Sequence, residues 1–155
     1  MGTWINRWKS TITYGTSDAD KKTLEVPVEE GEKFKGESMH MYRARLTDLT
    51  PGTTYTYKVE TEDGQTMDGH FRTLPENSNE IRFVVVSDSH RFETATKVSD
   101  VIAQFDPDFI LHTGDMVEGT GSQKDQFPYW FQNVGSFLHN VPVIYNSGNH
   151  DYGAY

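Results

Sequence analysis

Three polar clusters in the second half of the chain contain side chains that bind metal ions and transfer protons. They read SDSH at residues 87–90, GD at residues 114–115 and GNHD at residues 148–151. Carboxylate, amide and imidazole groups, in a chain that has no cysteine, are ligands suited to Mg, Mn, Fe or Zn. An adjacent histidine and carboxylate can also act as acid and base. The clusters therefore indicate a metal or acid–base site, provided that the fold brings them together.

The elements between these clusters are predicted from hydrophobic patterning. Continuous apolar runs within residues 81–87, 108–114 and 141–148 are typical of strands buried on both faces. Apolar side chains recur at helical spacing within residues 94–105 and again within residues 127–138. The resulting β-α-β-α-β order predicts parallel strands joined by right-handed crossovers.

Parallel strands would bring the three clusters to one edge of the sheet. The carboxyl ends of neighbouring strands lie side by side, about 4.8 Å apart, and α/β sheets bind ligands there. Asp88, Asp115 and Asn149 can therefore meet, although 27 and 34 positions separate them in sequence. Taken singly, each cluster has an ordinary explanation, as a helix cap, a turn or an Asx turn. Polar clusters at three successive strand ends favour a site over chance.

The first half of the chain predicts a different architecture. Its β-prone segments are short and separated by turn residues, which is typical of a β-sandwich. In TTYTYKVE, Tyr55 and Tyr57 alternate with polar residues, as in a half-buried antiparallel strand. Residues 75–79, PENSN, form a polar, turn-rich joint, so we expect one domain at residues 1–76 and a second at residues 80–155.

Both halves resemble known families. DSH, GD and GNHD, in this order at the ends of three strands, resemble the motifs of the calcineurin-like metallophosphoesterase superfamily. LTDLTPGTTYTYKV resembles the tyrosine corner of fibronectin type III-like sandwiches, with Tyr55 in the corner. Together with FRTLP, this stretch resembles the N-terminal domain of purple acid phosphatase-like enzymes. The resemblance implies a fibronectin type III-like β-sandwich followed by the first β-α-β-α-β part of a metallophosphoesterase α/β sandwich.

The resemblance also implies a role for each residue of the clusters. Asp88 and His90 would bind a first metal ion, Asp115 would bridge two ions and Asn149 would bind the second. His150 would stand beside the substrate, to protonate the leaving oxygen or stabilise charge on phosphorus. The expected cofactors are two divalent or trivalent ions, Fe, Mn or Zn, that share a hydroxide. The expected activity is the hydrolysis of phosphomonoesters or phosphodiesters.

Two neighbouring acids are candidates for supporting roles. Asp151 follows His150 and could orient it, although a surface or capping role fits the sequence equally well. Glu118 stands three positions after Asp115, where purple acid phosphatases have the tyrosine that binds ferric iron, so a tyrosinate–iron centre is not expected. Glu118 is predicted to be an outer group around the metal ligands or, preferentially, solvated. His112 is predicted to be a packed strand residue.

The superfamily's later ligands, histidines that include a GHxH motif, have no counterpart in the 155 residues. We therefore expect the chain to be truncated at both ends, without the first sandwich strand and the second half of the catalytic domain. On its own, the chain would bind at most one divalent ion, weakly, because two protein ligands rarely hold a transition metal against water. Its phosphatase activity would be negligible.

Composition limits the remaining possibilities. A net charge of −9, with 4 basic and 10 acidic residues from residue 79 onward, argues against a nucleic-acid-binding surface. No apolar run approaches the ~20 residues of a membrane span, and MGTWINRWKS lacks the apolar core of a signal peptide. The resemblance is compatible with a secreted or periplasmic full-length protein, and the sequence does not define the oligomeric state. The competing hypothesis is a non-catalytic binding module, whose sandwich recognises protein or glycan beside a vestigial α/β half.

Overall fold

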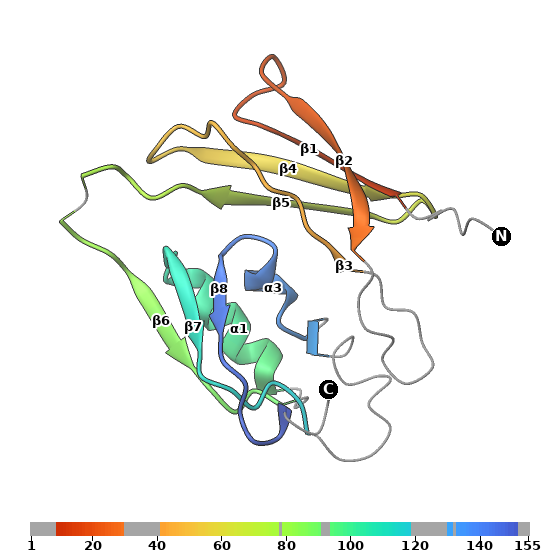
Figure 1. Ribbon diagram of the computed structural model, residues 1–155. Helices are drawn as coiled ribbons and strands as arrows, with labels where there is room; N and C mark the ends of the chain where they lie inside the picture. The colour runs from red at the N-terminus through yellow and green to blue at the C-terminus, as the bar shows by residue number, and fades with distance from the viewer. Residues whose placement is uncertain are drawn as a thin grey trace, which may run out of the picture. The chain divides into compact units, whose positions relative to one another are not determined.

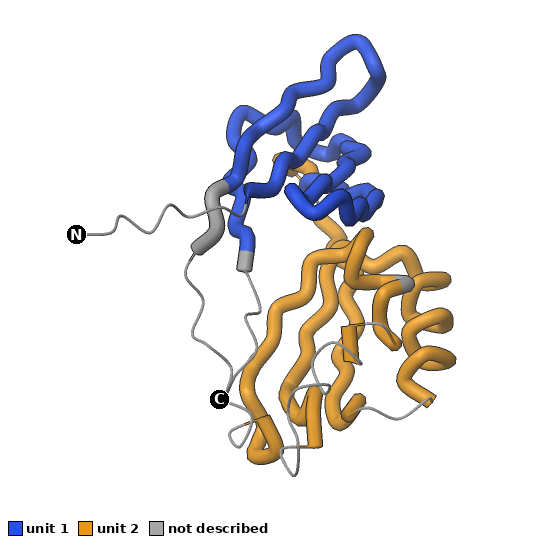
Figure 2. Tube along the Cα trace, turned by 90° about the vertical axis from the view of Figure 1, so that its right-hand side faces the viewer, with its two compact units in different colours: residues 1–73 blue, residues 74–155 orange. Residues whose placement is uncertain are grey.

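The structure is a computed structural model that describes most of the chain. The described residues are 9–29, 41–77, 79–90, 94–118, 130–131 and 133–151. The chain divides into two compact units, residues 1–73 and residues 74–155 (Figure 2). An antiparallel β unit precedes an α/β unit (Figure 1), which confirms the fold class predicted from the sequence.

The first unit contains an antiparallel sheet of five strands in the order β3-β2-β1-β4-β5. The strands are β1 (Lys9–Gly15), β2 (Lys22–Glu29), β3 (Met41–Tyr42), β4 (Thr54–Thr61) and β5 (Thr66–Arg72). β4 and β5 form a hairpin around Gly64, whose φ of +85° suits a tight turn. The opening residues 1–8 lie outside the described residues.

Tyr55 fixes the start of β4, as the resemblance to a tyrosine corner predicts. Its side chain is 7% exposed, and its hydroxyl accepts a hydrogen bond from the Thr50 backbone N–H at 2.9 Å. The ring stacks on Phe71 of β5, with centroids 5.3 Å apart. The buried phenol therefore ties the loop before β4 to the sheet, which confirms the predicted environment of Tyr55.

The second unit contains three parallel strands in the order β6-β7-β8. Its described elements are β6 (Phe83–Val86), α1 (Thr94–Gln104), β7 (Phe109–His112), α3 (Gly135–Leu138) and β8 (Val143–Tyr145). Residues 130, 131 and 133 are also helical, whereas residues 127–129 and 132 of the predicted second helix lie outside the described residues. In the part of the chain that the structure describes, no helix is long and apolar enough to cross a membrane.

The described helices cover one face of this parallel sheet. Ile110 of β7 is fully buried and clusters with Ile102 of α1 and Phe137 of α3. Val85 and Ile144 alternate to the opposite face, where each is 56% exposed. The prediction that the apolar strands are buried on both faces is therefore wrong for the described residues, because α1 and α3 pack on the same side.

Replacing Tyr55 by Phe keeps the stacked ring but removes the acceptor of the Thr50 N–H. We expect the free energy of unfolding to fall by about 1 kcal/mol, the usual net contribution of one hydrogen bond. Chemical denaturation measures the change, and Tyr145→Phe, on a side chain that is 62% exposed, is the control. If Tyr55→Phe were as stable as the wild type, the hydrogen bond would contribute nothing to the corner.

Candidate metal centre

The three clusters follow the carboxyl ends of β6, β7 and β8, which lie at one edge of the parallel sheet. Asp88 and His90 come from the loop after β6, and Asp115 comes from the loop after β7. One ligand atom from each of these side chains lies within 4.8 Å of the other two. Two loops thus place three potential ligands around a point that a metal ion could occupy.

The backbone of all three residues is strained. Asp88, His90 and Asp115 have φ angles of +52°, +41° and +57°, which are left-handed. Among the described residues, the other non-glycine positions with positive φ are Asp48 and Asp106. Such conformations cost about 1–2 kcal/mol each and persist only where the surrounding structure fixes them. The strain is therefore concentrated at the predicted ligands.

Backbone hydrogen bonds join the loop after β6 to the loop after β7. The Asp88 N–H donates to the Gly114 carbonyl at 3.0 Å, and the His90 N–H donates to the Asp115 carbonyl at 3.0 Å. Gly114 has a φ of +124°, a conformation that side-chain-bearing residues rarely adopt. These contacts set the register of the two loops that carry the predicted ligands.

Two glycines allow the loops after β7 and β8 to touch. A Cβ atom placed on Gly114 would lie 2.5 Å from the Gly148 nitrogen. A Cβ atom placed on Gly148 would lie 2.5 Å from the Asp115 nitrogen. Real Cβ atoms essentially never come closer than 3.0 Å, so both positions require glycine for close backbone approach.

Asp151 holds these two loops together. Its side chain is 0% exposed, and Oδ2 accepts hydrogen bonds from the N–H groups of Asp115 and Gly148, both at 2.8 Å. Oδ1 accepts from the N–H groups of Met116 and Val117 at 2.9 Å and 3.2 Å. Burial excludes the surface role that the sequence left open. The side chain acts as a cap for backbone N–H groups of two loops.

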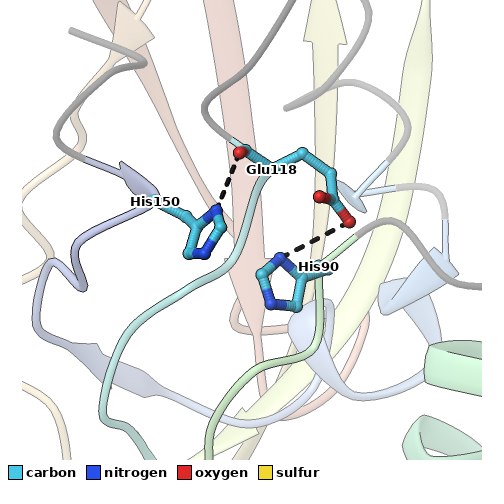
Figure 3. A group of neighbouring side chains, drawn as sticks. All are labelled: His90, Glu118 and His150. Atoms are coloured by element: carbon cyan, nitrogen blue, oxygen red, sulfur yellow. Dashed lines mark hydrogen bonds and ion pairs between the residues drawn. The ribbon is translucent and has the colours of Figure 1, made fainter.

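His150 is tied to the loop after β7 at its backbone and at its ring. Its N–H donates to Asp115 Oδ1 at 2.8 Å, and its ring Nδ1 lies 2.8 Å from the Glu118 carbonyl oxygen (Figure 3). A carbonyl oxygen can only accept, so Nδ1 carries a proton in this contact and Nε2 is left for another partner. The hydrogen bond to Glu118 raises the pKa of His150, and burial works in the opposite direction.

Glu118 lies beside both histidines of the site (Figure 3). His90 Nδ1 is 3.2 Å from the Val117 carbonyl oxygen and 3.7 Å from Glu118 Oε1. The rings of His90 and His150 meet edge to face with centroids 5.0 Å apart, and Glu118 forms a second group of potential metal-binding atoms with them. The sequence favoured a solvated Glu118, whereas its side chain is 29% exposed and faces His90.

Asn149 is the predicted ligand of a second ion, and its side chain is exposed. It lies between two residues whose backbone N–H groups are both bonded, Gly148 to Asp151 and His150 to Asp115. The structure therefore fixes the backbone on either side of Asn149 at the edge of the site. Its role as a ligand stays a prediction.

Two residues behind the ligands, Ser89 and Trp130, escaped sequence reasoning. Ser89 Oγ accepts a hydrogen bond from Trp130 Nε1 at 2.7 Å and lies 2.8 Å from His112 Nε2. His112 is 1% exposed, as expected for a packed strand residue, and burial lowers its pKa against the opposing effect of nearby carboxylates. No local pattern could have revealed these contacts, because Trp130 is 41 positions away from Ser89.

Two family models match the chain. Residues 3–73 match the model described as purple acid phosphatase, N-terminal domain, and residues 81–155 match the model described as calcineurin-like phosphoesterase. The chain therefore combines a purple acid phosphatase N-terminal domain with a calcineurin-like phosphoesterase domain, as its motifs predict. No curated protein matches the sequence significantly.

Two solved structures share this fold. Purple acid phosphatase PPD1 from yellow lupin (Lupinus luteus) seeds superposes with a TM-score of 0.71 at 19% sequence identity, over 94% of this chain and 31% of that one. A structure of PhoD superposes with a TM-score of 0.60 at 16% identity, over 97% of this chain and 34% of that one. The chain thus spans about a third of the length of these two proteins.

Replacing Asp151 by Asn tests its role between the loops. An amide offers one acceptor oxygen and one NH₂ group, so two of the four backbone N–H groups would face a donor. We expect the free energy of unfolding to fall by about 2 kcal/mol, since hydrogen bonds to a charged group contribute about 1.5–3 kcal/mol. Amide hydrogen exchange at residues 115–117 should accelerate. Asp100→Asn, on the exposed side of α1, is the control and should leave both measurements unchanged.

Replacing Gly148 by Ala tests the close approach of the loops. The new Cβ would overlap backbone atoms of Asp115, so the loops after β7 and β8 must separate. We expect a loss of about 1–3 kcal/mol in the free energy of unfolding, the range for overpacked sites, measured by chemical denaturation. Gly135→Ala is the matched control, because its Cβ would meet only His139 at an ordinary 3.8 Å. Equal stabilities of the two variants would contradict the tight contact.

Proposed function

We propose that this chain carries part of the active site of an enzyme that hydrolyses phosphate esters, monoesters or diesters, with metal ions. The observation that carries the proposal is the meeting of Asp88, His90 and Asp115 within 4.8 Å at the carboxyl ends of β6 and β7. The match of residues 81–155 to the calcineurin-like phosphoesterases supports the same chemistry. As this chain covers 31% of the lupin phosphatase, the activity is proposed for the whole protein to which this sequence belongs.

The residues of the site fit a metal ion. Two carboxylates held close together repel each other unless a cation lies between them. His90 points Nδ1 at the Val117 carbonyl oxygen, so Nε2 is the ring nitrogen that would coordinate a metal. Oxygen and imidazole donors without a thiolate suit Fe, Mn or Zn. Asp88, His90 and Asp115 are also held in strained conformations, which are typical of preformed functional sites.

Each residue of the proposed centre has a distinct role. Asp88 and His90 would hold a first ion, Asp115 would be shared with a second ion, and Asn149 would hold the second. Bound ions would supply Lewis-acid stabilisation of the phosphate charge and a nucleophile at neutral pH. Glu118 supports the histidines from outside, because its carboxylate faces His90 and its carbonyl holds the ring of His150.

His150 acts on the substrate rather than on the ions. Its backbone N–H and its ring Nδ1 are both bonded to the loop after β7, so the ring has a fixed orientation. The remaining Nε2 can donate a proton to the leaving oxygen or stabilise charge on phosphorus. The raised pKa of His150 favours the protonated ring that this role requires.

Two substitutions separate metal binding from proton transfer. Asp115→Asn removes the charge between the two ions, so we expect loss of bound metal and of activity. His150→Asn should keep the metal and lower turnover of p-nitrophenyl phosphate by about 10²–10⁴-fold, the usual contribution of a positioned acid or base. Metal analysis after dialysis and phosphatase assays in excess Mn²⁺ measure the two effects in the gene product that contains this chain.

The control for this pair is His139→Asn, on an exposed histidine outside the site. It should leave both metal content and turnover unchanged. Equal loss of metal in Asp115→Asn and His150→Asn would refute the proposed roles. A wild-type protein without metal and without hydrolysis would favour a binding module.

A further inference from the structure

A buried imidazole links the two loops that carry the proposed ligands. His112 ends β7, three residues before Asp115, and it is 1% exposed. Its Nδ1 accepts a hydrogen bond from the Gly114 N–H at 3.2 Å, and its Nε2 lies 2.8 Å from Ser89 Oγ. Ser89 stands between Asp88 and His90 in the loop after β6. One ring therefore contacts both loops from the side of the core.

The partners of His112 determine which nitrogen carries the proton. A backbone N–H can only donate, so Nδ1 must offer its lone pair to Gly114. The proton of the neutral ring is then on Nε2, which donates to Ser89 Oγ. Trp130 Nε1, also a donor only, gives a second hydrogen bond to the same hydroxyl. Ser89 Oγ thus accepts two hydrogen bonds, which fix its position from two directions.

Packing restricts the ring further. Trp130 is 3% exposed and meets His112 edge to face, with ring centroids 5.8 Å apart. Trp130 also belongs to the apolar core with Ile110 and Val134. A polar network inside an apolar core is costly unless its groups are paired, and it specifies one arrangement when they are paired. Here the donors of Trp130 and His112 converge on a single serine.

The position of Ser89 in the sequence connects this hydrogen-bond network to two of the proposed ligands. Ser89 is flanked by Asp88 and His90, whose left-handed backbones are intrinsically unfavourable. The two backbone hydrogen bonds between the loops hold Asp88 and His90 from their N–H groups. Ser89, which lies between Asp88 and His90, is held through its side-chain hydroxyl by the bonds from His112 and Trp130. The two backbone bonds and the contact between His112 and Ser89 all come from the segment 112–115.

We propose that His112 is a positioning residue that, through Ser89, sets the separation between Asp115 and the pair Asp88 and His90. The proposal rests on the proposed metal centre, because a fixed separation matters only if these groups share ions. His112 does not bind metal in this role, since both of its ring nitrogens are already occupied. Outer groups that orient metal ligands typically change affinity by about 10–100-fold when they are lost.

Three substitutions in this chain test the proposal with Mn²⁺ as the probe. Ser89→Ala removes the hydroxyl, and His112→Phe keeps an aromatic ring against Trp130 but removes both nitrogens. We expect each to weaken Mn²⁺ binding in calorimetric titration by about 10–100-fold. Ser89→Thr keeps the hydroxyl and should retain most of the affinity. Ser99→Ala, at a fully buried serine of α1, is the control and should bind Mn²⁺ like the wild type.

The link itself can be measured without metal. Long-range ¹H–¹⁵N NMR spectra of the apo protein should show His112 protonated at Nε2 and unprotonated at Nδ1. Amide exchange at Gly114 should be slow in the wild type and faster in His112→Phe. If the NMR spectra showed His112 protonated at Nδ1, this result alone would refute the hydrogen bond from the Gly114 N–H and with it the proposal.

The two measurements distinguish the failure of the inference from the failure of the proposed function. If Ser89→Ala and His112→Phe bind Mn²⁺ as tightly as Ser99→Ala, the positioning role is wrong and the network only stabilises the core. If the wild type binds no Mn²⁺ while the NMR spectra show the expected tautomer, the metal centre is wrong and the positioning role falls with it. Weaker binding in both variants, with recovery in Ser89→Thr, supports the proposal.

Discussion

The carboxylate of Asp151 is the contact on which the arrangement of the site depends. It accepts four backbone hydrogen bonds, three from residues 115–117 and one from Gly148. The hydrogen bonds from Met116 and Val117 are buried, so these N–H groups would otherwise lack partners, and an unpaired buried donor costs about 1–3 kcal/mol. The charge of Asp151 is offset by these four dipoles. Because the side chain is fully buried, water cannot replace it.

The close approach of the loops follows from this contact. Asp151 draws residues 115–117 against Gly148, and the absence of a side chain at Gly114 and Gly148 lets the two backbones meet. Asp115 is then bonded on both sides, through its carbonyl to His90 and through its carboxylate to the N–H of His150. A side chain held in this way would lose little freedom if it bound a metal ion, as proposed for Asp115. The strain at its left-handed φ is offset by the contacts around it.

The two units use their aromatic and polar residues differently. In the first unit, a phenol and a stacked phenyl ring, Tyr55 and Phe71, hold a loop against a sheet. In the second unit, Trp130 and His112 extend the core up to the back of the ligand loops. The hydrophobic core of the second unit therefore extends to Ser89, which lies between two of the proposed ligands. A change in packing at Trp130 reaches Ser89 through a single hydrogen bond.

The sequence by itself determined the order of the elements and the residue types available to the proposed metal centre. Alternating side chains around Tyr55, apolar runs before each cluster and the β-α-β order predicted an antiparallel unit followed by a parallel one, because local periodicity is encoded in the residues themselves. The motifs DSH and GD indicated three side chains that meet, those of Asp88, His90 and Asp115. The tertiary structure alone decided how they are held. Asp151 as a cap for two loops, Glu118 beside His90 and the contacts of Ser89 with His112 and Trp130 all join distant segments. The hydrophobic pattern also could not predict the exposed sheet face around Val85, because an apolar run does not indicate which face of the strand a helix will cover.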